Sequence, residues 1–152
     1  MSEATIQAGI QATFQAMAQF ADEDVTICDW SVLDGANSAG PYVIIEPADD
    51  VRSRQDVVTP ENRYGIKVGL WQQWADYETS LVAFATLRQA MLTAFNTTTG
   101  ERNPGATNAD IIEIRNITPI QYAPNPNLPP ELAAQADPIF IMQMFVFDTV
   151  EY

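Results

Sequence analysis

Residues 63–73 place the strongest constraint on the fold, because apolar residues alternate there with polar or small ones. A period of two is typical of a strand that buries one face. One face would carry Tyr64, Ile66, Val68 and Leu70, and the other Gly65, Lys67, Gly69 and Trp71. The first face is expected to meet the core. On the second face, Gly65 and Gly69 leave room for another backbone or ring to come close.

Two helices are predicted from apolar residues that recur every three or four positions. The first begins at Ser2, a suitable N-cap, and ends near Phe20. The second follows Asp76 and stops at Asn96. Their apolar stripes are Ile6, Ile10, Phe14 and Met17 in the first helix, and Leu81, Phe84, Leu87, Met91 and Phe95 in the second. Each stripe needs a partner surface.

Four further strands are predicted from short apolar segments with turn residues at their ends, at residues 25–32, 42–46, 111–122 and 139–150. Pro47 is expected to stop the second of these. The last one has apolar residues on both faces, which indicates a central strand or one covered by another subunit. The element order is α-β-β-β-α-β-β. The predicted fold is α+β, a mainly antiparallel sheet of about five strands with two helices packed on one face.

Two connections differ in composition from the rest of the chain. Residues 48–62 mix acidic residues and arginines, which indicates a long hairpin loop or charged arm. We expect this arm to be mobile in an isolated subunit and ordered on assembly. Residues 123–138 contain five prolines and should lie extended along the surface. Neither connection separates two cores, so residues 1–152 are predicted to form one domain.

The charge balance excludes the ordinary modes of nucleic-acid binding. The chain has 20 acidic and 7 basic residues, a net charge of −13, and Lys67 is its one lysine. Affinity for DNA or RNA comes largely from Lys and Arg that neutralise phosphates, and this surface would repel them. Solubility alone is an equally acceptable reason for the acidity.

The residue types argue against catalysis. The chain has no histidine, so the usual general base, the catalytic triads and most zinc sites are absent. No phosphate-binding loop is present, because the Gly100 to Gly105 segment lacks the lysine that a P-loop requires. Cys28 is the single cysteine, so the chain forms no internal disulfide. We expect no enzymatic activity, no cofactor and no metal, although carboxylate chemistry stays open on residue type.

Neither a signal-peptide pattern nor a run of 18 apolar residues occurs, so we expect the protein to stay in the cytoplasm where it is made and not to enter a membrane. Only 18% of the residues are charged. Much of the surface must then be neutral, which favours an oligomer whose faces are covered by neighbours.

Several landmarks together resemble the tail terminator proteins of long-tailed bacteriophages, which are also called neck or tail-completion proteins. They are the N-terminal amphipathic helix, the strand opened by Gly40-Pro41-Tyr42-Val43, the charged residues 49–62, the alternating strand from Tyr64 to Gln72, the helix after Asp76, and two closing strands. The likeness covers nearly the whole chain and contains no short diagnostic motif. The connection 123–138 is longer than the family pattern.

This resemblance implies a structural virion protein of the tail-neck region. In the family, six subunits form a ring that caps the tail tube and joins it to the head-neck connector. Tail tube protein and connector proteins are therefore the expected partners, besides other copies of the chain. Six copies of a chain with a net charge of −13 would carry −78, and an acidic lumen would let DNA pass without binding.

Candidate interface and lumen residues follow from the same resemblance and from the strand pattern. The arm contributes Arg52, Arg54, Asp56, Val57 and Val58 to subunit or partner contacts. Trp71 is either a core residue or a contact anchor, since Trp is enriched at interface hot spots. Asp110 and Glu113, beside the long polar loop, are the first candidates for acids in the lumen.

Three other hypotheses remain open. The chain could be another head-tail connector or tube component of a virion, which would work through the same kind of surface. It could be an acidic inhibitor that mimics DNA, although its acids are spread over turns, caps and the arm. It could also be a small carboxylate or metal-dependent enzyme. Gel filtration separates the first two, because assembly predicts a ring-sized species and mimicry a monomer.

Overall fold

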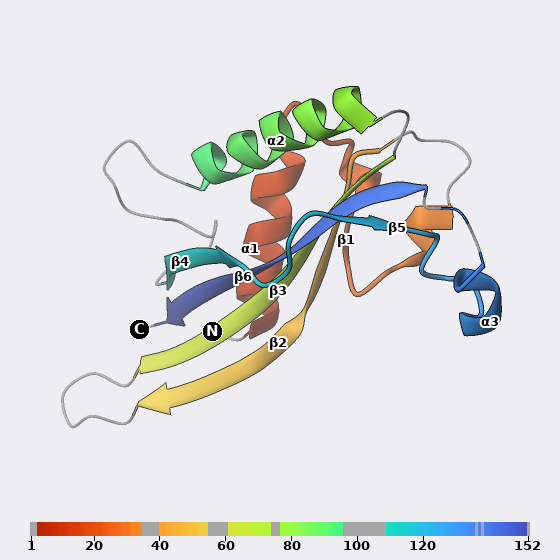
Figure 1. Cartoon of the computed structure of the whole chain (residues 1–152). Helices are drawn as coiled ribbons and strands as arrows, with labels where there is room; N and C mark the ends of the chain where they lie inside the picture. Colours follow the sequence, from red (N-terminus) through yellow and green to blue (C-terminus); the bar gives the residue numbers. More distant parts are fainter. Residues whose placement is uncertain are drawn as a thin grey trace.

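The computed structural model describes residues 3–34, 40–54, 61–73, 77–95, 109–135, 137 and 139–151. Its helices are α1 (Glu3–Gln15), α2 (Tyr77–Ala94) and the short α3 (Pro130–Ala133), with 3-10 turns η1 (Asp22–Asp24) and η2 (Ser31–Asp34). Its strands are β1 (Val25–Ile27), β2 (Tyr42–Arg54), β3 (Glu61–Gln73), β4 (Ala109–Asn116), β5 (Gln121–Ala123) and β6 (Phe140–Glu151). Figure 1 shows them as one twisted sheet with α1 and α2 on the same side.

The described strands form a single six-stranded sheet in the order β1-β2-β3-β6-β4, and β5 pairs with β6 beyond the end of β4. All pairings are antiparallel except β1 with β2, which is parallel. The β6 strand therefore has partners on both sides, as its two apolar faces predict. The sheet is mixed rather than purely antiparallel. After β1, the chain passes through η2 and comes back to the start of the sheet edge, so that β2 runs in the same direction as β1.

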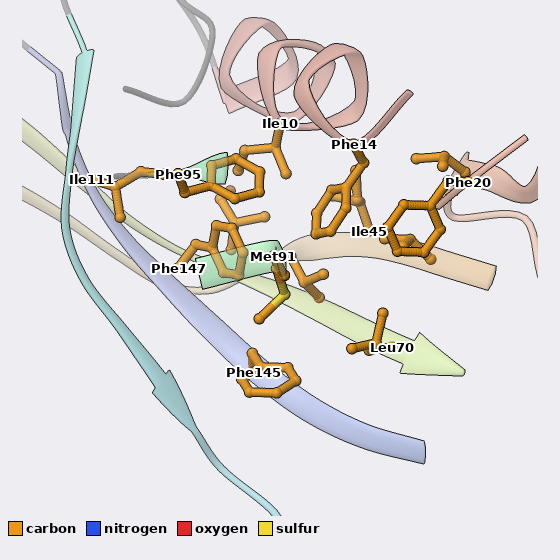
Figure 2. Packing of buried hydrophobic residues seen from close by; sticks show 14 of the residues in the cluster. Ile10, Phe14, Phe20, Ile45, Leu70, Met91, Phe95, Ile111, Phe145 and Phe147 are labelled. Atoms are coloured by element: carbon orange, nitrogen blue, oxygen red, sulfur yellow. The ribbon is translucent and has the colours of Figure 1, made fainter. Parts of the chain in front are cut away.

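The main core lies between the sheet and the two long helices (Figure 2). The alternation in β3 is confirmed, because Ile66, Val68 and Leu70 are fully buried in this core and Tyr64 packs against it. Both helices contribute their predicted stripes, except that α1 ends at Gln15 rather than near Phe20, so Met17 packs against the core from beyond the helix. At the centre, the rings of Phe14, Phe95 and Phe147 make edge-to-face or tilted contacts with centroids 4.9–6.2 Å apart.

A second, smaller apolar cluster occupies the opposite face of the sheet, which we call the open face. It contains Leu33, Tyr42, Ile44, Trp71, Phe140 and Met142. The segment after β1 covers it, and the Trp30 and Trp71 rings meet edge to face at 6.0 Å. A Cβ on Gly69 would lie 2.8 Å from Nε1 of Trp71, so the glycine is what lets the indole approach the strand. The close approach predicted for Gly69 is thus explained by a ring of the same chain.

The Pro-rich connection is held by hydrogen bonds to the segment that follows β1. The Asn125 side-chain amide donates to Oδ1 of Asp34 at 2.6 Å. The Asn127 amide donates to Oδ2 of Asp34 and to the backbone carbonyl of Trp30. Asp29 fixes the start of η2, because its Oδ1 accepts from the backbone N–H and the hydroxyl of Ser31. These hydrogen bonds lower the pKa of Asp29.

Three strand boundaries predicted from the sequence are also wrong. Pro47 does not stop its strand, because β2 continues to Arg54 through register shifts between Ile45 and Asp50 that accommodate the proline. The predicted strand 25–32 ends at Ile27, and Cys28 then takes a positive φ of 55° that turns the chain toward η2. The predicted strand 111–122 is divided into β4 and β5.

The predicted arm is also partly wrong, since residues 48–54 and 61–62 are strand residues of β2 and β3 rather than loop. They extend the two strands into a long ribbon. The remaining arm residues, 55–60, lie outside the described residues. The five-strand, two-helix prediction omits β5 and α3, which are three and four residues long and too short to produce a periodic pattern.

Candidate functional site

A shallow charged groove crosses the open face at the end of the sheet away from the Trp71 cluster. Its volume is about 190 Å³, smaller than the roughly 300–1,000 Å³ typical of small-molecule sites. It is lined mainly by charged side chains from four strands. The lining includes Arg52 of β2, Arg63 and Gly65 of β3, Glu113 and Arg115 of β4, and Asp148 of β6. A groove of this size and charge fits a few side chains of another protein better than a substrate.

Two ion pairs belong to the groove and its rim. Arg115 donates from Nε to Oδ2 of Asp148 at 3.1 Å, and Arg63 donates from Nε to Oε1 of Glu61 at 2.8 Å. The two arginine side chains keep 48% and 51% of their surface exposed, so both pairs are solvated. Exposed pairs of this kind stabilise a fold by about 0–1 kcal/mol. Their position therefore has more consequence for recognition than for stability.

Like charges stand opposite each other in the sheet around Gly65. The register pairs Arg52 with Arg63 across β2 and β3, and it pairs Glu113 with Asp148 across β4 and β6. Directly opposite like charges are unfavourable in a sheet. Arg115 offsets the acidic pair through its contact with Asp148. Glu61 is the partner of Arg63 at the basic pair.

In the register, the basic pair lies two positions from Arg54 and Glu61, where the described part of the β2–β3 ribbon ends. Figure 1 shows this end of the ribbon extending beyond the helices. We call its described residues, 51–54 and 61–63, the ribbon tip. The side chains of Val51, Arg52, Ser53 and Arg63 are exposed, and Val51 keeps 57% of its surface in solvent although it is apolar. Glu3 at the start of α1 accepts a hydrogen bond from the N–H of Ala48 at 2.6 Å, just before this part of the ribbon. The tip is thus outside the layer that α1 and α2 cover.

The predicted interface residues are separated in the structure. Arg52 lies at the ribbon tip with an exposed side chain, and Arg54 is the last residue of β2. Asp56, Val57 and Val58 lie outside the described residues. Trp71 is only 4% exposed and belongs to the second apolar cluster of its own subunit. A contact made by Trp71 with another subunit would require that cluster to open.

The predicted lumen acids lie on β4. Glu113 is exposed and lines the groove, so the structure brings it onto the same surface as Arg52. Asp110 pairs with Val150 in the register, two positions along β6 from Asp148, the residue that Glu113 faces. Both acids lie close to the ribbon tip, because Glu113 shares the groove with Arg52 and Arg63, and Val150 of β6 stands between Asp110 and Arg63 in the register.

Sequence reasoning missed Arg63, Arg115 and Asp148 as groove residues. They come from three strands that are far apart in the chain, and only the pairing of β3, β6 and β4 brings them together. The available signal was the alternation in β3, which puts Arg63 on the same face as Gly65 and Lys67. For Arg115 and Asp148, the β4 bulge between Ile111 and Glu113 changes which residues share a face, and no sequence pattern marks it.

The described side chains offer little for covalent or metal chemistry. Cys28 is exposed, but partial burial and then the charges of Glu46 and Glu3 raise the pKa of its thiol, which disfavours the reactive thiolate. No group of three His, Cys, Asp or Glu side chains in the described ranges is arranged to hold a metal ion. Among the described helices, none is both long and apolar enough to cross a membrane.

Comparison with known proteins yields a distant likeness. No protein-family model matches the chain, and no curated protein matches it in sequence. One structure of similar architecture is a chain from the virion of a native gene transfer agent particle. The two chains are 17% identical, the match covers 96% of this chain and 94% of the other, and the TM-score is 0.49. A likeness of this degree does not assign a role to this chain.

Proposed function

We propose that this protein is a structural component of a phage-like virion, a tail terminator whose subunits form a ring. In this role the ring caps the tail tube, joins it to the head-neck connector, and has an acidic lumen through which DNA passes. The work is done by surfaces, without catalysis and without a cofactor. The protein would be made in the host cytoplasm and act in the tail-neck region of the particle.

The observation that carries the proposal is the ribbon tip. The ribbon tip presents a strand edge and exposed charged side chains, and proteins usually cover or block such edges. A neighbouring subunit would cover this one. The whole-chain resemblance to tail terminators supports the same role, because the long ribbon occupies the place of the arm that such proteins use for contacts.

The first experiment measures assembly. Light scattering after gel filtration should give a particle of six times the 16.8 kDa subunit mass, and electron micrographs should show rings with a central channel. A protein that stays monomeric at every concentration tested would contradict the proposal. A ring with another number of subunits would agree with a connector role but would exclude the six-membered ring.

The second experiment concerns the lumen. The unmodified ring should not retain DNA at physiological salt, because its acids offer phosphates no cations. An Asp110→Lys, Glu113→Lys double variant should bind DNA at low salt and release it as the salt concentration rises. Tight DNA binding by the unmodified ring would make the repulsive lumen wrong, even if the ring itself forms.

A further inference from the structure

The pairing of β2 with β3 is irregular around Pro47. From Ile45 to Asp50 there are five steps along β2. The matching residues of β3, Val68 and Gly65, are only three steps apart, so β2 carries two extra residues here. Extra residues of this kind form bulges, which bend a strand and increase its twist. The direction that the ribbon takes beyond this point is therefore decided at the bulge.

Two side chains of α1 bind the backbone on either side of Pro47. Nε2 of Gln7 donates to the carbonyl oxygen of Glu46 at 3.1 Å, and Oε1 of Glu3 accepts from the N–H of Ala48 at 2.6 Å. Glu3 and Gln7 are four residues apart, so they lie on the same face of the helix. Gln7 is only 8% exposed, and a polar side chain buried to this degree requires a hydrogen-bond partner. The backbone groups that flank the proline are thus held by the helix.

The same polar stripe continues along α1 but leaves the bulge. Nε2 of Gln11 donates to the carbonyl oxygen of Val25 in β1 at 3.0 Å, and Nε2 of Gln15 donates to that of Asp22 in η1 at 3.1 Å. The stripe therefore repeats at every fourth residue, and each of its side chains binds the backbone of another element. One half of the stripe acts on the bulge, and the other half provides a matched comparison outside it.

The ribbon tip begins just past the bulge. Val51 follows Ala48 by three residues, and from Val51 to Arg54 the register with β3 runs without a further shift. A regular two-stranded ribbon carries the angle set at its base to its end. Figure 1 shows this end extending beyond the helices. The position of the tip therefore depends on how firmly the bulge at its base is held.

We infer that Glu3 and Gln7 clamp the Pro47 bulge at one bend and thereby set the direction of the ribbon tip. They are positioning residues, because their hydrogen bonds end at Glu46 and Ala48, before the tip. The consequence for assembly rests on the proposed function, in which the tip contacts a neighbouring subunit. A tip already held at its working angle loses less conformational freedom on binding, which favours association. The clamp itself is a property of one subunit.

The first test measures the direction of the tip. Spin labels on Ser53→Cys at the tip and Val82→Cys on α2, both exposed positions, report the distance between ribbon and helix layer in a Cys28→Ser background. Labelled subunits are mixed with an excess of unlabelled protein, so that only distances within one subunit are measured. The intact clamp should give one narrow distance distribution. A Glu3→Met, Gln7→Met double variant should broaden or shift it, because the side chains keep their length but lose the acceptor and the donor.

Two controls separate the clamp from a general weakening of α1. A Gln11→Met, Gln15→Met double variant removes the same kind of bond outside the bulge and should leave the distance distribution unchanged. Glu3→Gln keeps an acceptor oxygen, so the backbone N–H of Ala48 should exchange with solvent as slowly as in the unmodified protein. In Glu3→Met this exchange should be faster on the order of tenfold. Thermal unfolding checks that every variant is folded.

The second test measures assembly. The apparent dissociation constant between subunits, obtained by sedimentation, should rise several-fold in the Glu3→Met, Gln7→Met variant, because a tip that is no longer held must be ordered on binding. It should stay nearly unchanged in the Gln11→Met, Gln15→Met variant. Equal changes in the two variants would overturn the link between the clamp and assembly.

The outcomes separate the inference from the proposed function. A distance distribution that the Glu3→Met, Gln7→Met variant leaves narrow and unshifted overturns the clamp, whether or not rings form. An equal change in the Gln11→Met, Gln15→Met variant overturns it too, because any loss along α1 would then be sufficient. Unmodified protein that forms no ring but shows the expected change in distance contradicts the proposed function and supports the clamp.

Discussion

The two faces of the sheet differ in how completely the chain covers them. On the helix side, the buried Gln143 accepts from Arg88 of α2 and donates to the backbone oxygen of Thr118, whereas Oε1 of Gln72 has no hydrogen-bond partner among the described residues. On the open face, the buried indole N–H of Trp71 finds no acceptor among the described residues. A buried unsatisfied donor costs about 1–3 kcal/mol.

The face that stabilises the subunit is therefore not the face that is available for contacts with other proteins. The helix side supplies most of the buried apolar area. The open face has an apolar cluster at one end and solvated ion pairs at the other, where no element of the described chain lies over the sheet. Stability is therefore expected to depend on the first face, and recognition on the charged end of the second.

The largest effect is expected on the helix side. Phe147→Ala removes a fully buried ring that contacts Phe14 and Phe95, and it should lower the free energy of unfolding by about 3–5 kcal/mol. Urea denaturation measures the change. Val82→Ala on the exposed side of α2 is the control and should change it by less than about 0.5 kcal/mol. A Phe147→Ala loss as small as that of the control would break the contrast between the faces.

A smaller effect is expected in the apolar cluster of the open face. Gly69→Ala places a methyl group against Nε1 of Trp71 at 2.8 Å and Sδ of Met144 at 3.1 Å. Because the indole is rigid, the substitution should cost about 1–3 kcal/mol of folding stability. The same substitution in a Trp71→Phe background should cost less. An equal cost in both backgrounds would show that the indole does not set the limit.

At the charged end of the open face, the effect on folding should be smaller again. Arg115→Gln removes a solvated pair with Asp148, so the free energy of unfolding of the monomer should fall by at most about 1 kcal/mol. The loss should shrink as salt is added, because exposed charges are screened. A larger, salt-independent loss would mean that this end of the face stabilises the subunit after all.

The smallest effect is expected on the pKa of Asp29, which lies in the segment that covers the apolar cluster of the open face. Hydrogen bonds from Ser31 lower the pKa of Asp29 below 3.8 in the folded protein. A depressed folded pKa contributes stability above the unfolded pKa, which is lost as the pH falls through the folded value. NMR titration of Asp29 should show the lowered pKa, and Ser31→Ala should raise it. An unchanged pKa in Ser31→Ala would exclude the hydroxyl as its cause.

The sequence determined the elements whose pattern is long and local. The alternation from Tyr64 to Leu70, the stripes of both long helices and the two apolar faces of the last strand each repeat a burial requirement several times. Such repetition identifies a strand or helix and its buried side without knowledge of its neighbours. Composition also limited the chemistry that we expect. A chain without histidine lacks the usual general base, and a net charge of −13 disfavours binding to phosphates.

The tertiary structure decided what depends on single residues or distant partners. Pro47 is tolerated because a bulge in β2 accommodates it, and Cys28 ends β1 through one backbone angle. Only strand pairing opposes Arg52 to Arg63 and brings Arg115 to Asp148. The charged groove is a property of the register between strands, and one sequence contains no repeated pattern that specifies a register with a bulge in it.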